Sequence, residues 1–285
     1  MLYVYKCYIS MKLVNSTSMP QHQHTLPSPK RLVLSLLSAH DLDQVEISRL
    51  LQWGSLFDID AAAMRVTVGR LTRQGLLRSP QRGLYCIGPE GELITQTARD
   101  WVNAEQRIGP WHGEWIMVHT SHLGRSNKTA LRARERAFRL NGLAEFVAGL
   151  WCRPANFNES LPATRARLLS LGLEAEAVII RAADMPGTGE KELFALWPRE
   201  HLEDSYHRHI RSMEKSLSGL GKLSLSRAAL ETMLIGEAVI RQINADPLLP
   251  DPMVDSRSRR RMIALMKRYD RSGRKVWLEF MGSTP

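Results

Sequence analysis

The chain has 285 residues, of which 44% are hydrophobic and 24% charged, and these globular proportions exclude a disordered or fibrous protein. Lys and Arg number 39 against 29 Asp and Glu, so the formal net charge is +10 and the sequence pI is near 9.8. This excess favours an anionic partner such as nucleic acid, a phosphorylated ligand or an acidic membrane surface. The three cysteines, Cys7, Cys86 and Cys152, lie far apart, which excludes a disulfide scaffold and a cysteine-rich zinc site.

The amino-terminal residues carry no targeting pattern. No segment approaches the ~20 uninterrupted apolar residues that cross a bilayer, and no cleavage site follows the apolar start, so we expect a cytoplasmic protein without membrane association. Residues 1–25 are expected to form a flexible arm, because the run from Ser16 to Pro29 is polar and contains three prolines.

Three short helices and a hairpin are expected next. The apolar repeats have recognisable ends: a proline begins the first helix, Asp58 or Asp60 caps the third helix, and Gly75 ends it. The expected helices are 31–39, 44–54 and 61–74, and the expected strands are 76–78 and 84–87. This order is typical of a winged helix-turn-helix DNA-binding domain, which we assign to residues 26–88.

The third helix of this unit has two faces. Ala61, Met64, Val68 and Leu71 repeat at three and four residues and predict its buried stripe. The opposite face is basic and would enter the major groove, with the hairpin touching phosphates or the minor groove. The candidate DNA-binding residues are Arg65, Val66, Gly69, Arg70 and Arg73 on the helix, and Arg78, Gln81 and Arg82 on the hairpin. The alternative is a solvated basic helix followed by a soluble turn.

The remainder is expected to be α+β and then helical. A linker helix spans 89–108, and a ferredoxin-like α/β sandwich spans 109–198. Its expected strands are 114–120, 144–152 and 177–181, its helices are 128–140 and 161–171, and the apolar stretch 193–197 would close the sheet. Residues 199–285 form a helical domain, interrupted near 219–222 and ending in a helix 257–269 with a short tail.

No catalytic motif stands out. Phosphate-loop, dinucleotide-binding and hydrolase motifs are absent, and His201, His207 and His209 lack the spacing of a metal site, so we expect no enzyme, metal or cofactor. Two basic stretches, 125–139 and 257–275, are read either as solvated helix faces or as anion sites for a nucleotide-like ligand or flanking DNA.

The sequence resembles the phenylacetate-catabolism repressors, the PaaX-like regulators, from about Leu26 onward. The matching segments are 29–31, 64–71, 75–77, 82–85, 111–115, 149–154 and 246–250. The resemblance implies a homodimeric repressor with a winged domain, a ferredoxin-like domain and a helical effector or dimerisation domain. It also implies release from a palindromic operator of an aromatic-catabolism operon by an aryl-CoA thioester or another aromatic metabolite. The sequence departs from the family pattern after Pro250.

A ligand site consistent with such a role would use Trp111, Trp115 and Trp151 as an apolar wall and Arg153 for an anionic portion. Alternatively, these tryptophans are core and hinge residues. Two other functions remain open: a nucleic-acid-processing enzyme that uses the ferredoxin-like domain, and a DNA-binding protein that answers to no effector.

Overall fold

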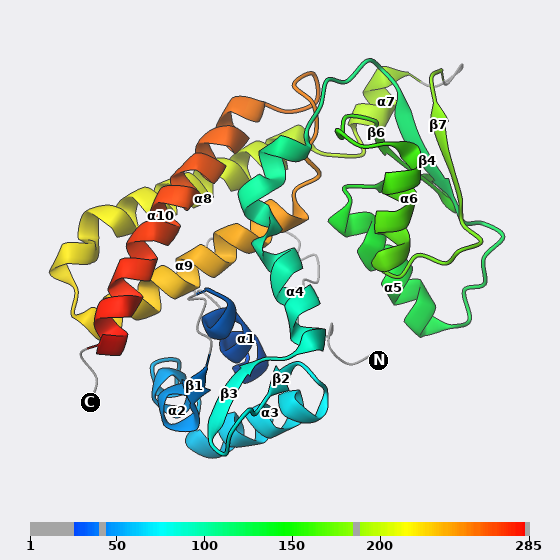
Figure 1. Cartoon of the computed structure of the whole chain (residues 1–285). Helices are drawn as coiled ribbons and strands as arrows, with labels where there is room; N and C mark the ends of the chain where they lie inside the picture. The colour runs from blue at the N-terminus through cyan, green and yellow to red at the C-terminus, as the bar shows by residue number, and fades with distance from the viewer. Residues whose placement is uncertain (1–25, 40–43, 185–188, 283–285) are drawn as a thin grey trace. The chain divides into compact units, whose positions relative to one another are not determined.

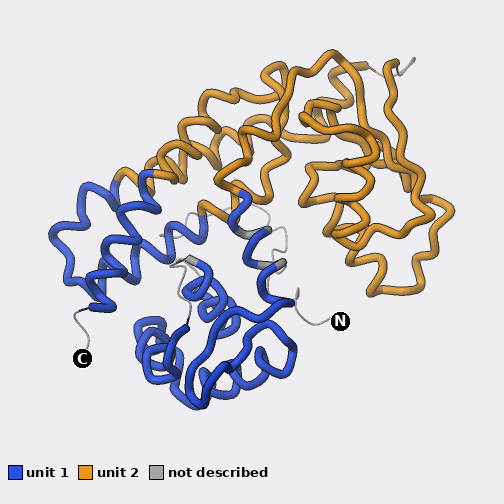
Figure 2. The backbone as a smooth tube through the Cα atoms, in the orientation of Figure 1, with its two compact units in different colours: residues 1–100, 215–238, 268–285 blue, residues 101–214, 239–267 orange. Residues whose placement is uncertain are grey.

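A computed structural model describes residues 26–39, 44–184 and 189–282. The chain is mixed α+β and divides into two compact units (Figure 2). Unit 1 comprises residues 1–100, 215–238 and 268–285, and unit 2 comprises residues 101–214 and 239–267. The expected arm, 1–25, lies outside the described residues, and the division into five segments stays a prediction.

Unit 1 begins with helices around a small antiparallel sheet of strand order β1-β3-β2. Its elements are α1 (Pro29–Ala39), β1 (Val45–Glu46), α2 (Ile47–Ser55), α3 (Ala61–Arg73), β2 (Leu77–Arg78), β3 (Leu84–Ile87) and α4 (Pro89–Arg99). The three expected helices and the hairpin are confirmed. Strand β1 was not expected: Val45 and Glu46 pair with Tyr85 and Leu84 of β3, which delays the start of α2 to Ile47.

Local sequence explains both ends of α3. The Asp60 carboxylate accepts hydrogen bonds from the backbone N–H groups of Ala62 and Ala63, which satisfies two donors of the first turn. Gly75 follows the helix at φ +70°, a conformation that glycine adopts without strain. Met64, Val68 and Leu71 are buried as expected. The expectation for Ala61 was wrong, because this first helical residue is exposed.

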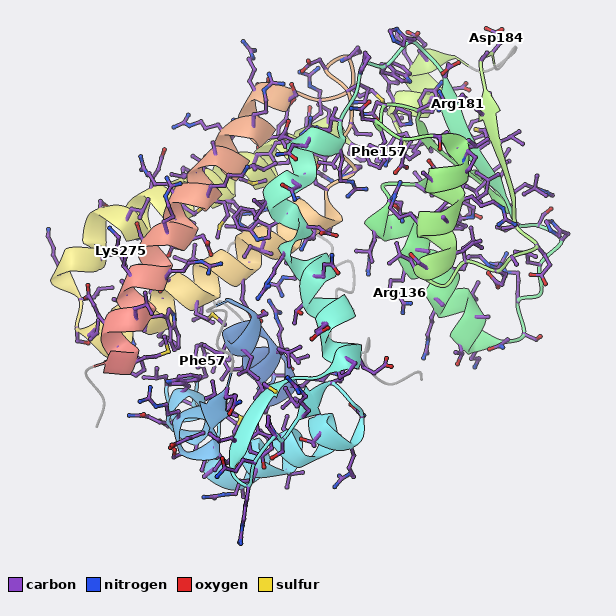
Figure 3. All side chains as sticks on the ribbon, in the orientation of Figure 1. Phe57, Arg136, Phe157, Arg181, Asp184 and Lys275 are labelled. Carbon is purple, nitrogen blue, oxygen red and sulfur yellow. The ribbon has the colours of Figure 1, made fainter. Side chains whose placement is uncertain are left out.

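The core of unit 1 also takes residues from the last two long helices, α9 (Leu225–Ala245) and α10 (Ser256–Gly282). The apolar residues of α1, α2 and α3 are buried together with Ala229 and Met233 of α9 and with Trp277 and Met281 of α10. Phe57, just after the end of α2, belongs to the same core (Figure 3). Polar contacts add to this packing. The Glu237 carboxylate accepts from Arg31 at 2.6 Å and from the Ser35 hydroxyl at 2.5 Å.

Unit 2 contains a four-stranded antiparallel sheet of order β5-β6-β4-β7. The elements run β4 (Trp115–His119), α5 (Lys128–Leu140), β5 (Ala144–Val147), β6 (Leu150–Pro154), α6 (Leu161–Ser170) and β7 (Val178–Ala182). Helices α5 and α6 cover one face of the sheet (Figure 1), where Phe138 and Leu168 pack on Ile116 and Val118. Four of the expected elements, β4, α5, α6 and β7, agree closely with the sequence prediction.

Two expectations for this part were wrong. The single strand expected at 144–152 is a hairpin, because Gly149 turns the chain at φ +77° and a Cβ there would lie 2.8 Å from the Ser121 Cα. Leu193–Trp197 is not a strand: its first two residues end α7 (Glu190–Phe194), the other three form a turn, and the extra strand of the sheet comes from the division of 144–152 into β5 and β6. The expected linker helix 89–108 is helical from residue 89 to residue 107, but it changes at Asp100 from α4 into a 3-10 helix, η2 (Asp100–Arg107).

The carboxyl-terminal part is helical, as expected, with α8 (Arg199–Gly219) and a short η3 (Leu220–Lys222) before α9. Helix α10 reaches Gly282, so the expected short tail after Tyr269 was wrong. The turns beyond Tyr269 are stabilised by packing, because Gly273 and Trp277 are buried. Within the described ranges, no helix combines the length and the apolar character needed to cross a membrane.

Candidate functional site

Helix α3 presents a basic, solvent-facing surface opposite its buried stripe. Arg65, Arg70 and Arg73 are exposed, and the Val66 side chain is 69% exposed although it is apolar. Between them, a Cβ built on Gly69 would have no atom within 4 Å. The helix backbone is therefore open to close approach at this point, with cationic side chains on both sides of the opening.

The hairpin after α3 carries the other sequence-predicted residues. Arg78, Gln81 and Arg82 are all exposed. The turn between the strands is held by hydrogen bonds that the Gln81 carbonyl accepts from the Ser79 hydroxyl at 2.8 Å and from the Leu84 N–H at 3.0 Å. Gly83 follows at φ +83°, and its carbonyl accepts from the Ile47 N–H at 2.9 Å, which ties the turn to the start of α2.

Charge along this segment is one-sided. Residues 61–87 contain five arginines, at 65, 70, 73, 78 and 82, and no aspartate or glutamate. None of these five guanidinium groups has a hydrogen bond or ion pair to a described residue. Guanidinium groups that are not neutralised by carboxylates are suited to phosphate oxygens and to the O6 and N7 atoms of guanine.

Much of the other basic charge is used inside the fold. In the stretch 125–139, Arg134 is 4% exposed and forms an ion pair with Glu174, Nη2 to Oε1 at 2.6 Å. In the stretch 257–275, Arg259 is 1% exposed and donates from Nε to Glu105 at 3.0 Å and from Nη1 to the Leu249 carbonyl. These two arginines are structural, so neither whole stretch is a free cationic surface.

The four residues proposed for a ligand wall do not share one surface. Trp115 pairs with Pro154 and Val118 pairs with Trp151. Because side chains alternate along a strand, Trp115 and Trp151 point to opposite faces of the sheet. Trp115 packs with Trp111 at 5.5 Å and with Trp197 at 6.3 Å between ring centroids. Trp151 packs with Phe138 of α5 at 4.7 Å, so each tryptophan is part of a packed cluster.

Arg153 lies on the helix-covered face and is 2% exposed. Its guanidinium donates to the carbonyls of Asn141, Pro154 and Pro247 and to Asn156 Oδ1. Burial, together with the positive charges of Arg167 and Arg107, lowers the pKa of Arg153 well below its ordinary value. The group is held by neutral oxygens rather than by a carboxylate.

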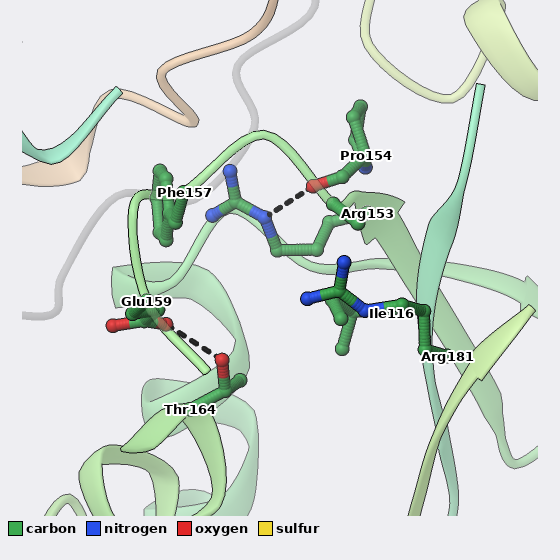
Figure 4. A pocket seen from close by; sticks show the side chains of 8 residues that line it. Ile116, Arg153, Pro154, Phe157, Glu159, Thr164 and Arg181 are labelled. Carbon is green, nitrogen blue, oxygen red and sulfur yellow. Dashed lines mark hydrogen bonds between the residues drawn. The ribbon is translucent and has the colours of Figure 1, made fainter. Parts of the chain in front are cut away.

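A small pocket of about 230 Å³, partly open, adjoins Arg153 (Figure 4). Its lining includes Ile116, Arg153, Phe157, Glu159, Thr164 and Arg181. Sequence reasoning named only Arg153 among these, because Phe157, Thr164 and Arg181 carry no motif and are brought together by the sheet. That volume includes open solvent. Ligand pockets usually measure about 300–1,000 Å³, whereas the space that a water-sized molecule can reach here is about 10 Å³, so only a small group could enter it.

Metal and thiol chemistry receive no support from the described part of the chain. It contains no group of three or more His, Cys, Asp or Glu side chains that could hold a metal ion. His207, one of the clustered histidines, contacts the Ser258 hydroxyl at 3.2 Å. Burial raises the pKa of the Cys152 thiol to about 12, so the reactive thiolate is scarce at neutral pH.

The chain was compared with known proteins. No protein-family model matches it, and no curated protein is significantly similar. A solved structure, "Uncharacterized protein Rv0674 from Mycobacterium tuberculosis", is similar with a TM-score of 0.55 and 19% identity, covering 87% of this chain and 99% of that chain. At this identity the likeness is one of fold, and it extends over nearly the whole of that protein.

Proposed function

We propose that the protein is a DNA-binding transcriptional regulator, with residues 26–88 as a winged helix-turn-helix domain and α3 as its recognition helix. The observation that carries this proposal is the five unpaired arginines on α3 and the following hairpin, in a segment without any carboxylate. The strand and helix order α1-β1-α2-α3-β2-β3 supports a winged domain, in which the hairpin would be the wing.

In this proposal α3 lies in the major groove and its exposed face reads base edges. Arg65 and Arg73 give bidentate contacts to guanine, Val66 contacts a thymine methyl group, and Gly69 lets the backbone approach the groove. Arg70, Arg78, Arg82 and Gln81 bind phosphates or the minor groove. Phosphate contacts supply affinity, while the base contacts supply specificity.

The rest of the chain would then serve regulation. The β-α-β-β-α-β order and the antiparallel sheet of unit 2 support a ferredoxin-like domain, and the long helices support a dimerisation or effector domain. A two-fold homodimer would place two α3 helices in successive major grooves, about 34 Å apart, on a palindromic operator. The family resemblance adds a repressor role in the cytoplasm and an aromatic or aryl-CoA effector that releases the DNA.

The test is a mobility shift with the purified full chain and its own upstream intergenic DNA, at ~150 mM salt with excess competitor DNA. Arg65→Ala should weaken specific binding by about 1–3 kcal/mol and leave the circular dichroism spectrum unchanged. Arg211→Ala removes an exposed arginine from α8 and is the matched control. Equal affinity of the wild type and Arg65→Ala would refute the assignment of the recognition face.

The effector is tested in the same assay with phenylacetyl-CoA, other aryl-CoA thioesters and free aromatic acids. Release by one class of compound supports a ligand-responsive repressor. A ligand shifts the equilibrium between the DNA-binding and the released conformation only if its affinities for the two conformations differ. A specific shift that no compound alters would favour an effector-independent DNA-binding protein. The absence of a specific shift would contradict the regulator and favour a nucleic-acid-processing role.

A further inference from the structure

Three guanidinium groups surround one aromatic ring at the pocket of unit 2. The Cζ atoms of Arg153, Arg107 and Arg167 lie 3.4, 4.7 and 5.2 Å from the centroid of the Phe157 ring. Cation–π attraction to the ring stabilises such groups, but it does not neutralise their charge. Positive charge is therefore concentrated at one end of the sheet.

Carboxylates compensate this charge only in part. Glu159 is the one acidic residue in the pocket lining. Its carboxylate accepts hydrogen bonds from Nε and Nη2 of Arg167 and from the Thr164 hydroxyl, so its direct ion pair is with Arg167. Burial is the largest single influence and raises the pKa of Glu159. The hydrogen bonds from Arg167 and Thr164, with the positive charges of Arg167 and Arg107, together outweigh it, so the pKa is lowered and the pair stays charged.

Arg153 is a buried cation without a carboxylate in hydrogen-bond contact, and only the more distant charge of Glu159 favours its charged form. A guanidinium has five N–H donors, and Arg153 uses four of them on neutral oxygens. Burying a charge that has no counter-ion is costly, and a bound anion would offset that cost. Nη1 of Arg167 is an unsatisfied donor nearby: it is buried and has no hydrogen-bond partner among the described residues.

Arg181 of β7 is exposed and belongs to the lining of the pocket (Figure 4). Only its Nη1 is engaged, by Glu114 at 2.8 Å. Arg153 belongs to the same lining. The pocket thus combines a buried cation that has no carboxylate in hydrogen-bond contact with an exposed one at its mouth.

We propose that this pocket binds a small oxyanion, the carboxylate or phosphate group of a ligand, between Arg153 and Arg181. The buried Arg153 supplies a fixed charge and donor, and Arg181 closes on the anion from the rim. Charge-assisted hydrogen bonds of this kind are about twice as strong as neutral ones. This proposal depends on unit 2 alone and does not require that the protein bind DNA.

The experiment measures the melting temperature of the full chain with increasing inorganic phosphate, and separately acetate, at constant ionic strength balanced with chloride. A ligand that binds only the folded state raises the melting temperature in proportion to ln(1 + [L]/Kd). The two anions distinguish a phosphate site from a carboxylate site. Isothermal titration calorimetry with the more effective anion then gives the dissociation constant.

Arg181→Gln should weaken anion binding about tenfold and Arg181→Lys should restore part of it, because lysine keeps the charge but loses the fork of donors. Arg211→Gln, which removes an exposed arginine elsewhere in unit 2, should bind as the wild type does. If neither anion shifts the melting temperature, or if Arg181→Gln and Arg211→Gln respond alike, the site is absent. A positive result with no operator binding would support this site and refute the proposed function.

Discussion

The indole of Trp53 packs edge-on against the indole of Trp277, with ring centroids 6.2 Å apart and ring planes at 90°. The two residues are 1% and 2% exposed. Such edge-to-face pairs are worth about 0.5–1.5 kcal/mol beyond the burial of their area. This contact joins α2, which precedes the proposed recognition helix, to the last helix of the chain, so α10 is part of the core on which α3 packs.

Trp277→Ala should therefore lower the free energy of unfolding by about 3–5 kcal/mol, the usual cost of removing a buried tryptophan. Urea denaturation followed by circular dichroism measures it. Leu278→Ala, the 60% exposed neighbour, should change stability by no more than about 0.5 kcal/mol. Similar losses for the two variants would contradict the role of α10 in this core.

Gly69→Ala should have opposite effects on stability and on DNA binding. Glycine inside a helix costs about 1 kcal/mol relative to alanine, and a Cβ at this position meets no atom, so the variant should unfold at higher denaturant concentration. The same methyl group would stand between the helix backbone and the groove, and operator affinity should fall. A more stable variant with unchanged affinity would show that this backbone does not approach DNA.

Arg82→Gln at the tip of the hairpin should change the salt dependence of DNA binding. Each phosphate contact that is lost reduces the slope of log K against log salt by about 0.9. Mobility shifts or anisotropy between 50 and 300 mM salt would give the slope for the wild type, Arg82→Gln and Arg211→Gln. We expect the slope to change only for Arg82→Gln, and a slope equal to that of the wild type would remove Arg82 from the interface.

The ion pair of Arg134 and Glu174 predicts a pH dependence of stability. The hydrogen bond from Arg134 holds the pKa of the Glu174 carboxyl below its ordinary value of 4.5. A carboxyl with a lowered pKa in the folded state stabilises the protein above its unfolded pKa, and the contribution is lost as pH falls through the folded pKa.

Glu174→Gln should accordingly cost more stability at pH 7 than at pH 3, measured by denaturant unfolding at both values. Glu176→Gln is the control, since Glu176 is exposed and its side chain has no described partner. If the cost of Glu174→Gln is the same at both pH values, the ion pair does not contribute in the way that its geometry indicates.

Local sequence was enough to determine the elements that matter most for the proposed interface. Asp60 and Gly75 delimit α3, and the spacing of Met64, Val68 and Leu71 orients it, so its basic face could be assigned before the structure was known. The hairpin was also predictable, because a short run with Ser79, Pro80 and Gly83 separates two apolar segments. The capping residue, the glycines and the apolar spacing each act over only a few neighbouring residues.

Tertiary structure alone decided which distant residues meet. Strand pairing places Trp115 and Trp151 on opposite faces, and a change of one residue in register would have reversed this, so no local pattern could predict it. The same pairing brings Arg153, Phe157 and Arg181 to one pocket and buries Arg153 among backbone carbonyls. The length of α10 likewise follows from burial of Trp277 against α2, a contact between residues from nearly opposite ends of the sequence. Periodicity within an element fixes which side chains share its face, whereas long-range packing fixes what that face contacts.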